Sequence, residues 1–167
     1  MTTDSGRSLD ALRNDLREIE EAQAAARRVT SAASEASAKL DSAHAWGTYD
    51  TWFGGGLISS LIKHDRIDQA QDLMSSVDHS LRRLRKELAD IGIDEVRGVE
   101  IGDVHKTLDI WFDNIFSDVM TQSRISDADA RLTAVGDAVR RLQTELARRR
   151  QEVLDEVAAW QARDTET

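Results

Sequence analysis

The apolar residues of the first third of the chain recur at alternating spacings of three and four, from Leu9 to Ala43. Such spacing places them on one helix face and is typical of a coiled-coil seam, the apolar stripe through which long helices pack. The 167 residues include no proline, so no residue of this kind interrupts the helices. We expect a first helix over residues 8–45, with Ser8 as its N-cap. Its seam comprises Leu9, Leu12, Leu16, Ile19, Ala22, Ala26, Val29, Ala33, Ala36, Leu40 and Ala43.

Leu and Ile give way to Ala in this seam after Ile19, which predicts close approach of a bulky neighbouring helix. Gly54-Gly55-Gly56 marks the break that follows, and a second helix is expected over residues 57–91. Its polar stretch around Lys63–Arg66 predicts an interruption, with Asp68 capping a restart. The seam of the second helix comprises Leu57, Leu61, Ala70, Leu73, Val77, Leu81, Leu84, Leu88 and Ile91.

Three glycines in 92–102 predict an extended connector, after which Asp103 caps a third helix over 103–123. Its inward residues should be Val104, Leu108, Trp111, Ile115 and Val119. A fourth helix is expected over 126–163, with Ser123 or Ser126 as its N-cap. Its seam comprises Ala128, Leu132, Val135, Val139, Leu142, Leu146, Val153 and Trp160. We favour a break between the last two helices over one continuous helix of about sixty residues, roughly 90 Å long.

These elements predict one all-α domain over residues 1–167. The favoured architecture is an elongated antiparallel four-helix bundle, formed by two coiled-coil hairpins related by a pseudo-twofold axis. A long three-helix coiled coil is the alternative.

A repeat supports the pseudo-twofold. Thr48–Phe53 returns 59 residues later as Thr107–Phe112, and a second pair of similar segments follows at an offset of 58. The repeat makes Asp50 equivalent to Asp109, and Arg66 equivalent to Arg124. A carboxylate buried among aromatic rings costs free energy unless it is paired, so we expect reciprocal Asp–Arg pairs.

The repeated centre has two interpretations: a pair of stabilising corners left by a duplication, or a polar pocket that binds a ligand. Glycines before a helix can present amides to an anion, and His64–Asp68 and His105–Asp109 each share a helix face. We nevertheless expect no cofactor and no metal, because the P-loop spacing and the Glu-x-x-His motif of di-iron bundles do not occur. The candidate ligand- or partner-binding residues are Asp50, Trp52, Gly54, Gly55, Gly56, Lys63, His64, Arg66, Asp68, Asp109, Trp111, Asp113 and Arg124.

Composition narrows the function. The net charge of −9 disfavours nucleic acid as a partner, and the arginines at 140–141 and 148–150 interleave with acids as in a solvated, salt-bridged face. Arg149 falls on a seam position, where it could pair with an acid. Cysteine is absent, no Gly-x-Ser-x-Gly motif occurs, and no apolar run reaches the ~18 residues of a membrane span. The N-terminus also lacks a signal-peptide core. These features favour a cytoplasmic protein that is not an enzyme, with secretion without a cleavable signal as the alternative.

Two helices that flank Trp52-Phe53-Gly54 resemble the WxG helical hairpins secreted by actinobacterial and firmicute type VII systems. The resemblance covers residues 8–91. Those hairpins usually carry a Tyr-x-x-x-Asp/Glu signal after the second helix, whereas the single tyrosine of this chain is Tyr49. The main hypothesis is a helical protein–protein interaction or scaffold protein that forms a homodimer. A small-ligand or ion-binding bundle and a WxG-type secreted hairpin are the alternatives.

Overall fold

The computed structural model is all-helical. It describes residues 7–50, 59–91, 106–107, 109–111 and 123–165, and the side chains within 7–40, 72–91, 106–107, 109–111 and 128–164. Three long helices, α1 (Leu9–Asp50), α2 (Ser59–Asp90) and α4 (Ser123–Thr165), account for most of these residues. Residues 106–107 and 109–111 are also helical, and we call them the Trp111 segment.

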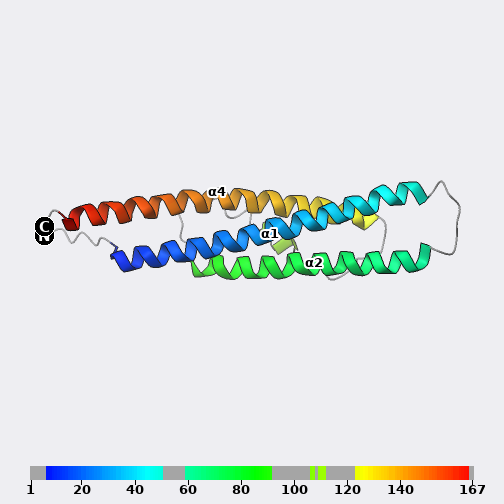
Figure 1. Ribbon diagram of the computed structural model, residues 1–167, viewed down its shortest axis with the longest axis horizontal. Coiled ribbons are helices and arrows are strands. Elements are labelled where there is room, and N and C mark those ends of the chain that lie inside the picture. The colour runs from blue at the N-terminus through cyan, green and yellow to red at the C-terminus, as the bar shows by residue number, and fades with distance from the viewer. Residues whose placement is uncertain (1–6, 51–58, 92–105, 108, 112–122, 166–167) are drawn as a thin grey trace.

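Helix α1 is the central element of the described structure. It runs antiparallel to both α2 and α4 (Figure 1). Extensive contacts connect α1 with each of them, whereas no comparable contact connects the described parts of α2 and α4. At the end where the termini lie, α2 stops short, and the start of α1 and the end of α4 continue beyond it (Figure 1).

The buried face of α1 is wider than its predicted seam because it contacts two helices. The predicted seam is confirmed, since its residues with described side chains are buried, except that Leu9 and Leu16 are half-buried. Ala25 is also buried, and Ala32, seven residues later, packs against the core. These two alanines lie beside the seam on the surface of α1. They form a second contact stripe next to the seam, which widens the buried face of the helix.

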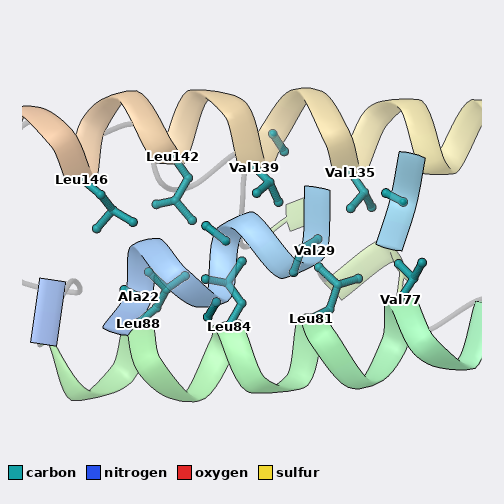
Figure 2. Close-up of a cluster of buried hydrophobic side chains, with 14 of the residues drawn as sticks. Ala22, Val29, Val77, Leu81, Leu84, Leu88, Val135, Val139, Leu142 and Leu146 are labelled. Carbon is teal, nitrogen blue, oxygen red and sulfur yellow. The ribbon is translucent and has the colours of Figure 1, made fainter. Parts of the chain in front are cut away.

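Small residues of α1 face large residues of its neighbours, as predicted. Figure 2 shows Ala22 and Val29 of α1 between leucines of α2 and branched residues of α4. The facing residues are Leu81, Leu84 and Leu88 from α2, and Val135, Val139, Leu142 and Leu146 from α4. Within the described part of the chain, no polar or charged residue is buried.

Charged residues stand at the heptad positions on both sides of the alanines beside the two seams. Lys39 lies seven residues after Ala32 of α1, and Arg131 lies seven residues before Ala138 of α4. Seven residues before Ala25 stands Glu18, and seven residues after the buried Ala138 of α4 stands Glu145. Beyond the end of α2, Arg7 joins the two remaining helices: it pairs with Asp15 of α1, and its Nη1 lies 3.4 Å from Glu156 Oε2 of α4.

Two predicted boundaries are wrong. Helix α1 continues past Ala45 and through Gly47 to Asp50, because one glycine costs a helix only about 1 kcal/mol relative to alanine. Helix α2 has no restart at Asp68, since polar side chains do not interrupt backbone hydrogen bonding.

The remaining helix boundaries lie within a few residues of the prediction or fall outside the described residues. The Ser8 N-cap is confirmed, because the Ala11 amide donates to Ser8 Oγ at 3.2 Å. Helix α4 begins at Ser123, three residues before the expected start. The glycine break, the connector at 92–102 and the junction between the third and fourth helices lie outside the described residues.

Enlarging Ala26 should destabilise the protein, because its side chain is 0% exposed and lies on the face that α1 shares with two helices. Ala26→Leu should lower the free energy of unfolding by about 1–3 kcal/mol through overpacking. Ala38→Leu is the matched control, since Ala38 is exposed on the same helix. Urea unfolding followed by circular dichroism measures both. Equal stability of the two variants would mean that α1 is not tightly packed at Ala26.

Candidate functional site

Trp111 is the only aromatic residue in the described core, and its side chain is 1% exposed. The prediction that it points inward is confirmed. Its neighbours point outward: Ile110 is 48% exposed, and the side chain of Asp109 is 62% exposed. A single buried ring therefore anchors the Trp111 segment to the long helices.

The expectation of a buried carboxylate at Asp109 is wrong. Two residues along a helix correspond to a rotation of about 200°, so the burial of Trp111 turns Asp109 toward solvent. The nearest ionic partner of Asp109 is Arg85, with 4.0 Å between Asp109 Oδ1 and Arg85 Nη1. Arg66 is one of the two expected partners of Asp109. It precedes Arg85 by 19 residues on the continuous helix α2, which corresponds to about 28 Å along the helix axis. An Asp109–Arg66 pair is therefore out of reach.

The remaining predicted site residues are placed only by their backbone or not at all. Asp50 ends α1, and Lys63, His64, Arg66 and Asp68 lie in the first turns of α2, near the same end of the molecule (Figure 1). Arg124 lies in the first turn of α4. The side chains of these six residues, and all of Trp52, Gly54, Gly55, Gly56 and Asp113, lie outside the described parts.

This placement separates the predicted residues into two groups. The Trp111 segment lies near the middle of the bundle, away from the end that α1 and α2 share (Figure 1). The start of α2 and the Trp111 segment therefore do not form one site. Any pocket around Lys63–Asp68 would have to be built without Asp109 or Trp111.

A polar border joins α1 to α4, and it was not predicted. Ser37 Oγ donates to Asp129 Oδ1 at 2.6 Å, Gln143 Nε2 donates to Thr30 Oγ1 at 3.3 Å, and Arg150 Nη2 lies 3.0 Å from Glu20 Oε1. These cross-helix contacts define the antiparallel register of the two helices. The sequence signal was the heptad spacing of Gln23, Thr30 and Ser37 beside the α1 seam.

Two shallow grooves open to solvent follow this border. They share Arg27, and polar side chains dominate both. One is lined by Glu20, Gln23, Arg27, Ala147, Arg150 and Gln151, and the other by Arg27, Thr30, Ser31, Ser34, Glu35, Ala38 and Gln143. Several of these side chains already bond across the helices, so the grooves are the surface of a helix–helix contact rather than an enclosed site.

The arginines of α4 form the salt-bridged face that was predicted. Arg148 pairs with Glu145 and Glu152, and Arg140 pairs with Asp137. The hydrogen bond to Glu145, with smaller effects of both carboxylates, raises the pKa of the Arg148 guanidinium. Arg149 at the seam position pairs within its own helix, with 3.4 Å between its Nη1 and Glu152 Oε2.

Two buried polar atoms lack a hydrogen-bond partner among those described. They are Oδ1 of Asp78, on α2, and Nε1 of Trp111. The other oxygen of Asp78, Oδ2, accepts a hydrogen bond from Arg82 Nε at 2.9 Å. One atom is an acceptor and the other a donor. Across the described ranges, no group of three or more His, Asp or Glu side chains could hold a metal ion.

No family model matches the chain, no curated protein matches it, and no solved structure matches it. Of the helices that the structure describes, none is both long enough and apolar enough to cross a membrane. Inferences about function therefore rest on the geometry of the described residues.

Truncating Trp111 should strongly destabilise the protein. Trp111→Ala removes the largest fully buried side chain of the described core and should lower the free energy of unfolding by about 3–5 kcal/mol. Thermal and urea unfolding of the purified variant measure this effect. A variant that melts with the parent protein would show that the ring is not part of the folded core in solution.

Removing the Asp109 charge should have a small effect. Asp109 and Arg85 are both more than half exposed, and pairs of this kind contribute about 0–1 kcal/mol. Asp109→Asn, Arg85→Gln and the double variant should each unfold within about 1 kcal/mol of the parent. A loss of several kcal/mol in the Asp109→Asn variant alone would mean that the carboxylate is buried and paired in solution.

Proposed function

We propose that this chain is a non-enzymatic helical interaction or scaffold protein that forms a homodimer. The observation that carries the proposal is the separation of apolar side chains in the core from charged side chains on the surface. The described core is entirely apolar, and the charged side chains lie on the outer faces of long helices, largely paired with one another. We expect such a surface to orient a protein partner through complementary charges.

The proposed architecture is a four-helix bundle in which the Trp111 segment belongs to the helix predicted over residues 103–123. Neighbours in a square bundle contact each other and diagonal helices do not. Helices α2 and α4 both contact α1 but have no comparable contact with each other, which fits a diagonal pair. The pair of Asp109 with Arg85 and the burial of Trp111 support a fourth position beside α2. A pseudo-twofold between two hairpins is part of this proposal.

Helix length supports a role as an interaction platform. Helix α4 has 43 residues and α1 has 42, which correspond to about 63–65 Å each. Stable protein interfaces bury about 1,200–2,000 Å² in total, and an elongated bundle presents several outer faces on which such an area fits. The paired charges on these faces can set orientation and partner choice, as charges flanking coiled-coil seams do.

The alternatives depend on residues whose side chains are not described. Ligand or ion binding would use residues near the shared end of α1 and α2. A WxG-type hairpin would use Trp52-Phe53-Gly54 and the antiparallel pair of α1 and α2. Such a helix pair is common to many helical proteins. No observation on the described residues favours either over the interaction protein.

The mass of the protein in solution tests self-association. Size-exclusion chromatography with light scattering at micromolar concentration should give twice the chain mass of 18.6 kDa. A monomer across the accessible concentration range would contradict the homodimer.

The absence of native cysteine allows the interface to be located. Ser31→Cys, Ser76→Cys and Thr144→Cys each place one thiol on an exposed position of α1, α2 and α4. Mild oxidation should cross-link one of these variants efficiently and the other two poorly, so each serves as a control for the others. Equal, slow cross-linking at all three positions would indicate random collision rather than a defined interface.

A further inference from the structure

We propose that the outward face of α2 binds an acidic helix of a partner protein. Arg82, Arg83 and Lys86 lie on this face with His79, and all four side chains are exposed. We call these four residues the α2 basic stripe. The inference rests on the proposed role as an interaction protein and names the chemistry of one partner, but it does not depend on self-association.

The α2 basic stripe lies opposite the core. Counted from His79, its members stand at positions i+3, i+4 and i+7, so they share one helix face over about 10 Å of the axis. Lys86 follows the buried Leu81 by five residues, a rotation of about 140°. The exposed acidic residues in the described part of α2 are Asp72 and Asp90, so they lie before and after the stripe and not within it.

The cations of the stripe reach the surface, whereas their acidic neighbours lie beneath them. Arg82 Nε lies 2.9 Å from Asp78 Oδ2, and Arg83 Nε lies 3.6 Å from Glu87 Oε1. The arginine side chains are 60% and 54% exposed, but those of Asp78 and Glu87 are 13% and 14% exposed. A guanidinium has five N–H donors and can bind more than one carboxylate. An approaching partner therefore meets positive charge.

The arginine-rich face of α4 is different. Glu145 and Glu152, which pair with Arg148, are 27% and 41% exposed. Both carboxylates reach the surface beside the guanidinium, so positive and negative charges are mixed where a partner would approach. The two faces thus have similar residue types, but the outer charge of the α2 basic stripe has a single sign.

Charge and length favour an acidic helix as the partner. Two copies of the stripe facing each other would repel. A long polyanion such as DNA would extend past the stripe and approach a chain whose net charge is −9. An acidic helix needs to match the stripe over only about 10 Å. Its carboxylates share one face when they recur at spacings of three and four, which are the spacings of the stripe.

Titration of the full chain with a fluorescent synthetic helix tests the proposal. The probe is a peptide of about 20 residues of Glu, Gln and Ala in which all Glu residues share one face. A second peptide has the same composition, with Glu distributed around the helix. Fluorescence anisotropy at low ionic strength should show binding of the first peptide, about fivefold or more tighter than the second and weakened by added salt. No binding of the first peptide, or equal affinity for both, would overturn the proposal.

Charge reversal locates the binding face. Arg83→Glu combined with Lys86→Glu should weaken binding of the first peptide about tenfold or more. Arg28→Glu combined with Arg141→Glu is the matched control, since both arginines are exposed, on α1 and α4, and the net charge changes equally. This control should bind nearly as the parent does. Equal losses in the two double variants would mean that total charge governs binding. If the stripe variant does not fold, Lys86→Glu alone should still weaken binding about threefold, and an unchanged affinity would overturn the proposal.

Two further measurements exclude other partners. In light scattering, the stripe variant should have the same mass as the parent, whether the parent is a dimer or a monomer. A dimer that dissociates on Arg83→Glu and Lys86→Glu would mean that the stripe binds a second copy. A DNA duplex of similar length that binds more tightly than the acidic peptide would mean that the stripe binds phosphates. Either result would overturn the proposal.

Discussion

The rest of the described structure depends on the close packing of α1 against two helices at once. A helix that contacts one partner needs a narrow apolar stripe, but α1 presents a seam and a neighbouring stripe that includes Ala25 and Ala32. Where the seam carries a small residue such as Ala22, the leucines of α2 and the branched residues of α4 approach α1 from both sides (Figure 2). Large residues on α1 would push the two outer helices away and remove their contacts with the centre.

Alanines lie between charged residues at the heptad positions beside the two seams. Ala25 and Ala32 lie between Glu18 and Lys39 on α1, and Ala138 lies between Arg131 and Glu145 on α4. Past the end of α2, Arg7 joins Asp15 and Glu156 across the two remaining helices. The described cross-section therefore changes along the molecule: α1 and α4 continue past the end of α2, and all three long helices are present at the level of the Trp111 segment (Figure 1).

The burial of Trp111 bears on the role of the repeated motif. Its burial shows that at least this tryptophan of the repeated motif belongs to the core rather than to an exposed recognition surface. The exposed Asp109 and its pair with Arg85 then account for a carboxylate that the motif placed next to aromatic residues. With this ring used internally, the described outer faces of α1, α2 and α4 carry mainly charged and polar side chains.

The sequence by itself determined the helical class, the Ser8 cap, the inward residues of three long helices and the burial of Trp111, because the three-and-four spacing of apolar residues follows directly from helix geometry. It did not determine which helices touch, since a seam records that a face is buried and not by what. The sequence predicts an end of the first helix at residue 45 and an interruption of the second at 63–66, yet helix propensity is a weak local preference that a long packed helix overrides. The partner of Asp109 also required the tertiary structure. The repeat made Arg66 equivalent to Arg124, but the continuous course of α2 carries Arg66 far from the Trp111 segment and brings Arg85 beside it.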